Sequence, residues 1–172
     1  MKSVIVGLTV AILTLATVAC SKTSNVSYKD SVKQALEQAD LKDVSVSEDK
    51  DKNTITLDGK LHSEDAKEQA GKVAQSVAPG RTIANQISVE PVGVEGDAKK
   101  IESNVDDGIE SNYKAALIAN GLSKQDIRFS AKNGVLTLKG KVKASDQKQE
   151  AAQLASSVPN VSQVVNNIQV SR

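Results

Sequence analysis

Histidine and cysteine, the side chains most often used to hold transition metals or to carry nucleophilic catalysis, occur only once each in this 172-residue chain. His62 has no second histidine or thiol partner for a metal pair, and we interpret it as a solvated loop residue. Cys20 has no other cysteine with which to form a disulfide. A metal site would need oxygen ligands alone, and no acidic cluster has the spacing of a calcium loop. Without a Gly-x-Ser-x-Gly elbow either, we expect no catalytic residues, no enzyme activity, no metal and no cofactor.

Lysines form a pattern with a different chemistry. Lys139, Lys141 and Lys143 alternate along a stretch, so in a strand their ammonium groups leave one sheet face together. Such a stripe can attract anionic lipid headgroups, at about 1 kcal/mol for each lysine near the surface. It is also a common way to keep a sheet soluble and to protect its edge. A second candidate patch is Lys114 with Ile118, one helical turn apart, which suits a bilayer interface or packing between domains equally well.

Charge is divided unevenly along the chain. Residues 28–90 carry 9 basic and 12 acidic side chains, a net charge of −3, whereas residues 107–172 carry 9 basic and 5 acidic ones, a net charge of +4. An anionic membrane should therefore be bound by the second half. The whole chain is close to neutral, at +1, and has only three aromatic residues. We expect no nucleic-acid partner and no small-molecule substrate.

These residues lie in an internal repeat with an offset of 81 positions. Residues 55–61 (ITLDGKL) recur as residues 136–142 (LTLKGKV), and the same offset relates Asn85 to Asn166. Two copies with one spacing indicate two sibling domains rather than a solenoid. Each unit is only about 60 residues long and buries a modest fraction of its surface, so we expect the two units to pack against each other or a further surface.

The repeated stretch has the period of a strand with one buried face. Gly59 and Gly140 fall on that face, where a glycine often marks the close approach of another backbone. We expect the helix that follows to be the neighbour in each copy. The alternative is a strand that simply ends at a permissive residue. Asn85 and Asn166 lie in phase with apolar neighbours and are expected to satisfy backbone groups at a bulge.

The elements of the first unit follow from periodicity and capping signals. A helix is expected over residues 28–39, capped by Ser27, followed by a strand from residue 44 and the strand of the repeat. Ser63 caps a second helix, which Pro79-Gly80 ends. Residues 83–89 form the closing strand.

The second unit repeats this order after a linker, residues 91–106. Its first helix either starts near residue 97 and runs on or starts afresh near Gly108, and the sequence leaves both open. Asn133-Gly134 predicts a type I′ hairpin. Ser145 is expected to cap the last helix, and residues 161–170 form the last strand. The fold class is therefore α+β, two tandem αββαβ domains at residues 28–90 and 107–172. Each is a small three-stranded mixed sheet with two helices on one face.

The N-terminus has the pattern of an export signal. Residues 1–19 contain a positive start and an apolar run too short to span a bilayer. The run ends in LATVAC, which resembles the lipobox of bacterial lipoproteins and implies that Cys20 carries the lipid anchor, with residues 20–27 as a tether. The alternative is a plain secretory signal cleaved nearby. The absence of Asp after Cys20 implies sorting to the outer membrane, facing the periplasm.

Each unit resembles the BON (bacterial OsmY and nodulation) domain. The resemblance lies in a strand ending in Leu-x-Gly-x-Leu/Val, a capped helix after it, and a closing strand with Asn85 or Asn166. The resemblance covers both units. Two such domains behind a lipobox resemble the dual-BON outer-membrane lipoproteins, which implies binding to anionic phospholipid membranes and a role in envelope integrity, without catalysis. The alternative is an envelope interaction protein that docks on an outer-membrane assembly machine or the cell wall.

Overall fold

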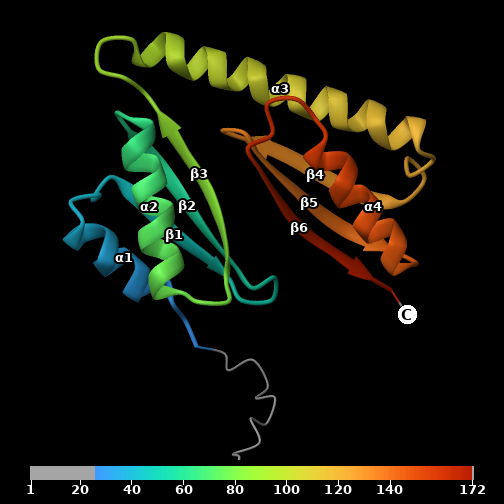
Figure 1. Ribbon diagram of the computed structural model, residues 1–172, viewed down its shortest axis with the longest axis horizontal. Coiled ribbons are helices and arrows are strands. Elements are labelled where there is room, and N and C mark those ends of the chain that lie inside the picture. The colour runs from blue at the N-terminus through green and yellow to red at the C-terminus, as the bar shows by residue number, and fades with distance from the viewer. Residues whose placement is uncertain (1–25, 172) are drawn as a thin grey trace, which may run out of the picture.

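The computed structural model describes residues 26–171, which form two domains of the same design (Figure 1). The first consists of α1 (Lys29–Gln38), β1 (Val44–Asp49), β2 (Thr54–Leu61), α2 (Glu64–Val77) and β3 (Thr82–Val89). The second consists of α3 (Glu95–Ala119), β4 (Asp126–Lys132), β5 (Val135–Val142), α4 (Ser145–Ser156) and β6 (Gln163–Val170). The residues before 26 lie outside the described part, and the signal, Cys20 and most of the tether fall there.

Each domain has one three-stranded mixed sheet. The first two strands pair antiparallel, with Val46 opposite Leu57, and the third pairs parallel with the second, with Leu57 opposite Asn85. The second domain has the same strand order and the same register, shifted by 81 residues. The two tandem αββαβ domains predicted from the periodicity are therefore confirmed.

Both helices of each domain cover one face of its sheet. Val32 and Leu36 of α1 and Ala70 and Ala74 of α2 pack on the inward-facing side chains of β2, such as Leu57. In the second domain the corresponding core contains Tyr113 of α3, which is fully buried and donates its hydroxyl to the Ala151 carbonyl at 3.1 Å. Burial raises the pKa of Tyr113 to about 12.

Helix starts depart from the predicted caps in two of three cases. Ser63 does cap α2, accepting the Ala66 N–H at 3.2 Å. Ser27 does not cap α1, because its hydroxyl donates to the Glu48 carboxylate at 2.6 Å. Ser145 is already the first residue of α4, and the Gln147 side chain accepts the backbone N–H groups of Lys143 and Ala144 there.

The segment predicted as the linker, residues 91–106, is mostly helical, because α3 is one continuous helix from Glu95 to Ala119. Gly108 lies within it without a break, so of the two possibilities the long helix is the one formed. Three acidic side chains at helical spacing attach α3 to both domains. Glu102 accepts the Val89 N–H of β3 at 3.0 Å, while Asp106 and Glu110 accept N–H groups of the β4–β5 hairpin, including those of Asn133 and Ala131.

The paired glycines are required by a strand backbone, not by the following helix. Gly59 and Gly140 have φ of +141° and +117°, and a Cβ at either would lie about 2 Å from a carbonyl oxygen, that of Asp43 (2.2 Å) or Asp126 (1.9 Å). Asp43 immediately precedes β1, and Asp126 opens β4. The expectation of close helix packing is therefore wrong, although the close approach of another backbone is real.

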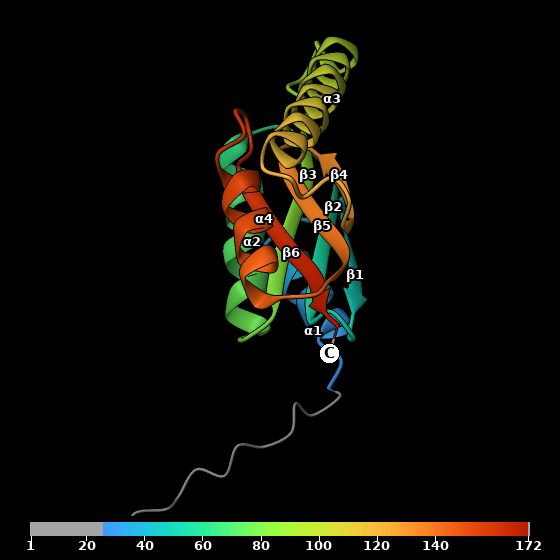
Figure 2. The same ribbon diagram turned by 90° about the vertical axis from the view of Figure 1, so that its right-hand side faces the viewer.

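The two domains contact each other reciprocally. A small buried cluster, separate from both cores, consists of Ala84 of β3, Val135 of β5 and Val165 of β6. The Asn133 side chain at the hairpin turn of the second domain donates to the Gln86 carbonyl of β3 at 2.6 Å, and Thr54, beside the hairpin turn of the first, faces Asn167 of β6. Each hairpin end thus touches the third strand of the other domain, as in a two-fold symmetric contact. From the side, α2 and α4 lie on the same side of the molecule and α3 extends along one end (Figure 2).

Candidate anion-binding surface of the second domain

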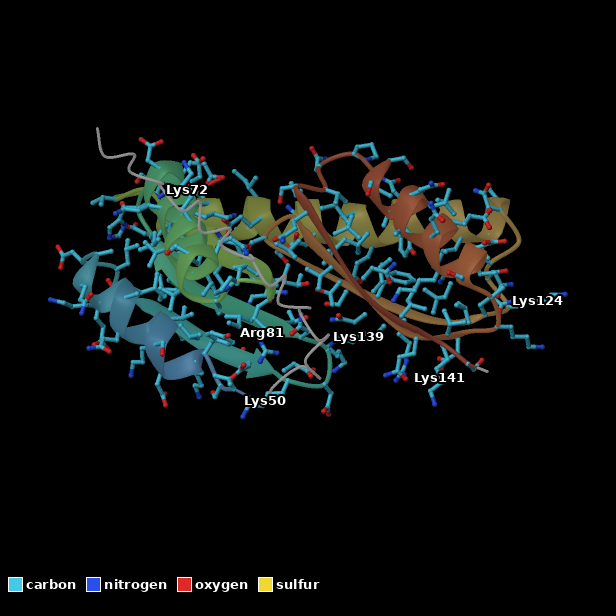
Figure 3. The ribbon with its side chains drawn as sticks, turned by 60° about the horizontal axis from the view of Figure 1, so that its bottom comes forward. Lys50, Lys72, Arg81, Lys124, Lys139 and Lys141 are labelled. Carbon is cyan, nitrogen blue, oxygen red and sulfur yellow. The ribbon has the colours of Figure 1, made fainter. Side chains whose placement is uncertain are left out.

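The lysines predicted to form a stripe leave the open face of the second sheet. Lys139 and Lys141 are exposed residues of β5, and Lys143 is exposed just beyond the end of that strand. Among residues 26–171, none of the three has a carboxylate oxygen within 4.0 Å of its ammonium group. In Figure 3, which brings the lower end of Figure 1 forward, Lys139 and Lys141 lie on the same side as Lys50 in the β1–β2 turn.

Lys139 and Lys141 line a shallow groove of about 300 Å³ at the junction of the domains, which is called the basic groove below. Its other lining residues are Lys52, Arg128, Gly140, Asn167 and Gln169. Lys143 is not among them, so the structure brings together two of the three predicted lysines and adds two cations, Lys52 and Arg128, that the sequence analysis missed. Every charged residue lining the basic groove is basic.

Electrostatic influence crosses the domain boundary at this groove. The Lys52 ammonium, from the β1–β2 turn, pairs with the Asp49 carboxylate. The hydrogen bond from Lys52 and the charge of Lys139 together hold the pKa of Asp49 below its usual range, despite the opposing effect of burial. The second domain's lysine is therefore close enough to act on a carboxylate of the first domain.

The second candidate patch lies elsewhere. Lys114 and Ile118 are exposed on α3, which covers the helix side of the sheet, opposite to the open face that carries Lys139. Ile118 is 58% exposed and is not used for packing between the domains. The two patches are therefore on different faces, and one flat membrane surface would not easily meet both.

The first domain carries the counterpart of the basic groove with opposite charge. Asp58, Gly59 and Lys60 occupy the positions of Lys139, Gly140 and Lys141, and they line a cleft of about 460 Å³ between the domains. There the Asp58 carboxylate pairs with Lys132 of the second domain, and Lys60 pairs with the buried Glu90 at 2.9 Å. The charges of Asp58 and Lys60 are therefore paired within the chain.

The remaining predicted residues have structural contacts. The side-chain amides of Asn85 and Asn166 donate to the helix carbonyls of Lys67 and Lys148, at 2.8 and 3.1 Å, in strands of regular register rather than at a bulge. His62 is exposed, with its Nδ1 2.9 Å from the Glu90 carbonyl oxygen. Within the described residues, no cluster of three His, Cys, Asp or Glu side chains is placed to hold a metal, and no helix is both long and apolar enough to cross a bilayer.

Two αββαβ units of this register, with one glycine in each central strand, define the class. The chain belongs to the BON domain family, whose model matches residues 24–91 and 105–172. Among individual proteins it is similar to the osmotically inducible protein Y of Escherichia coli K12, with 29% identity over 139 residues, which cover 80% of this chain and 68% of the relative.

Solved structures with some likeness include two of CdsD, a structural protein of the type III secretion system of Chlamydia trachomatis. One has 10% identity and a TM-score of 0.37, covering 81% of this chain and 90% of that one. The other, its C-terminal domain, has 18% identity and a TM-score of 0.33, covering 83% and 67%.

Proposed function

We propose that this protein is a lipid-anchored, periplasm-facing envelope protein whose second BON domain binds anionic phospholipid membranes and thereby supports outer-membrane integrity. Membership of the BON family and similarity to an osmotically inducible protein support a role in the cell envelope. The anchor rests on the sequence around Cys20. No feature of the described residues suggests catalysis, and the proposal includes none.

The observation that carries the proposal is the set of cations with no internal partner on the open face of the second sheet. Lys139, Lys141 and Lys143 are exposed without a carboxylate near them in the described part of the chain, whereas Lys60, the first-domain counterpart of Lys141, is paired with Glu90. An exposed lysine without an ion pair can form a favourable ionic interaction with an anionic surface. Lys60 already has such an interaction with Glu90.

Liposome flotation of the soluble double domain, residues 21–172, tests this function. The protein should float with vesicles containing phosphatidylglycerol and not with vesicles of phosphatidylcholine alone, and raising the salt from 0.05 to 0.5 M should weaken the association because exposed charges are screened. Replacing Lys139, Lys141 and Lys143 by glutamine together should weaken binding by up to about 3 kcal/mol.

An absence of binding at every lipid composition would overturn the proposal. The alternative would then be preferred, in which the same face docks on an envelope assembly machine or on the cell wall.

A further inference from the structure

The basic groove is built from two rows of residues that the strand register places side by side. Arg128, Lys139 and Asn167 are directly opposite one another across β4, β5 and β6, and Asp126, Lys141 and Gln169 form the next row. Three cations and two amide groups thus lie close together on this area of sheet, with one carboxylate, that of Asp126, at its edge. Lys52, from the other domain, closes one side of the groove.

The pairing of Arg128 with Lys139 is unfavourable unless something neutralises it. Like charges directly opposite in antiparallel strands destabilise a sheet, and the nearest acidic partner, Asp126, lies 3.5 Å from Arg128 in a pair that is largely exposed. An anion held between Arg128, Lys139 and Lys141 would remove this repulsion. Arginine and lysine donors together suit a phosphate group, which accepts several charge-assisted hydrogen bonds.

The first domain shows what happens at the same position when the charge is reversed. Asp58, the counterpart of Lys139, receives an oppositely charged group from outside its own domain, the ammonium of Lys132. At position 139 the residue is a lysine, and no described carboxylate oxygen lies within 4.0 Å of its ammonium group. Asp49, the carboxylate on which Lys139 acts, is already paired with Lys52, so an ion pair at Lys139 would need an anion from outside the described chain.

We propose that the basic groove binds a single phosphate group, carried by an anionic phospholipid headgroup, between Lys52 of the first domain and Arg128, Lys139 and Lys141 of the second. The inference rests on the proposed function and sharpens it. Membrane recognition becomes a property of the two packed domains together, because one of the four cations belongs to the acidic first domain.

The test compares single-site variants of the double domain. Lys52→Gln should weaken binding to phosphatidylglycerol vesicles roughly fivefold, the effect expected for one lysine near the surface, although Lys52 is not in the second domain. Lys139→Asp, which introduces the first-domain residue, should weaken it more than tenfold. Lys124→Gln and Lys72→Gln, exposed lysines remote from the groove (Figure 3), are the matched controls and should change binding less than twofold.

A second measurement identifies the ligand chemistry. Dihexanoyl phosphatidylglycerol, titrated below its micelle concentration, should shift the amide resonances of Gly140 and Asn167 in a saturable way, and Lys139→Asp should abolish the shifts. If inorganic phosphate saturates the same resonances at equal or lower concentration, the groove is a free-phosphate site and the assignment to lipid is overturned.

The two proposals fail separately. If wild type binds anionic vesicles but Lys52→Gln and Lys139→Asp bind as tightly as it does, the groove is not the site, while the proposed function stands. If wild type binds no vesicles, the proposed function falls. The proposed phosphate site in the groove is then overturned as well, unless dihexanoyl phosphatidylglycerol shifts the amide resonances of Gly140 and Asn167 in a saturable way. In that case the groove binds single lipid molecules.

Discussion

Ala84 and Val165 occupy equivalent positions in the two copies of the repeat, 81 residues apart, and both belong to the small buried cluster where the domains meet. Both are about 1% exposed. The side chains that form this contact lie on the open sheet faces, which in each domain are opposite to the helices. The two units thus pack against each other, which is one of the two possibilities expected from their small size, and the contact uses part of each open face.

Val165→Asp should separate the domains while leaving each folded, because a carboxylate would be buried in the contact without a partner whereas the two cores do not include this residue. Small-angle X-ray scattering should show a larger radius of gyration, and circular dichroism should be unchanged. Val170→Asp, at a position 40% exposed, is the control and should alter neither. An unchanged radius of gyration for Val165→Asp would show that this cluster does not hold the domains together.

Gly59→Ala and Gly140→Ala should each destabilise their own domain by about 1–3 kcal/mol, because the new Cβ would meet a backbone carbonyl and because φ is positive there. Gly108→Ala is the control. It lies in the continuous α3 with open space around it, so the change should stabilise the helix by about 0.5–1 kcal/mol. Urea unfolding followed by circular dichroism measures all three. Equal stability of wild type and the Gly59 and Gly140 variants would contradict the close contact.

Glu48→Gln should lower the free energy of unfolding at pH 7 by about 3 kcal/mol, since it leaves the Arg81 guanidinium buried without its ionic partner 3.4 Å away. The Ser27 hydroxyl, the Tyr28 N–H and Arg81 hold the pKa of Glu48 below 4.5, against the opposing effect of burial. A depressed pKa contributes stability above about pH 4.5 that is lost as the pH falls through the folded-state value.

The difference between wild type and Glu48→Gln should therefore shrink between pH 7 and pH 3. Glu68→Gln, which removes an exposed pair with Lys72, is the comparison and should leave the free energy of unfolding nearly unchanged at both pH values. A gap between wild type and Glu48→Gln that is as large at pH 3 as at pH 7 would mean that the carboxylate charge is not what stabilises this site.

Ile118→Glu distinguishes the helix patch from the lysine stripe. The change introduces the residue that the first copy carries at this position, Glu37, and should leave vesicle binding within twofold of wild type if the open sheet face meets the membrane. Flotation of each isolated domain at matched ionic strength complements this test, and the net-positive second domain should bind better than the first. Loss of binding in Ile118→Glu, with the lysine variants intact, would assign the membrane face to Lys114 and Ile118.

Cys20→Ser should abolish lipidation and move the protein from the membrane fraction to the soluble periplasm, because two or three acyl chains together provide a stable anchoring that headgroup binding alone does not. Metabolic labelling with a radioactive fatty acid, followed by fractionation, measures both effects. Ser21→Ala is the control and should remain lipidated. If Cys20→Ser still fractionates with the outer membrane like wild type, the anchor is elsewhere.

The fold could be predicted because its signals are local and duplicated. Apolar alternation, Ser63 and the Asn133-Gly134 turn, where both residues have positive φ, each specify a short segment without reference to the rest. The cap at Ser27 was predicted wrongly for the opposite reason. The hydroxyl of Ser27 is used by Glu48, 21 residues away in the sequence, and a pattern confined to one helix does not contain that partner.

Of the four cations that line the basic groove, only Lys139 and Lys141 were predicted from the sequence. Arg128 could have been found, because a two-residue turn at Asn133-Gly134 fixes the hairpin register and so places Arg128 opposite Lys139. Lys52 could not, because its position in the groove depends on how the domains pack, through one small apolar cluster and polar contacts such as that of Asn133 with Gln86. The buried ion pair of Glu48 and Arg81 was missed because its two residues are 33 positions apart in the first domain and the second copy, with Phe129 in place of Glu48, does not repeat it.

The reciprocal contact between the domains has a consequence for how the two copies could diverge. Two separate chains meeting in this way would form a dimer whose two ends were identical and whose assembly depended on protein concentration. Joined in one chain, the domains meet at an effective concentration set by the connecting segment, independent of expression level. Fusion also permits the ends to differ, and here Asp58 at one end is paired with Lys132, while Lys139 at the other end has no ion pair among the described residues. The duplication has thus produced a molecule with a direction, able to present one particular end to a surface.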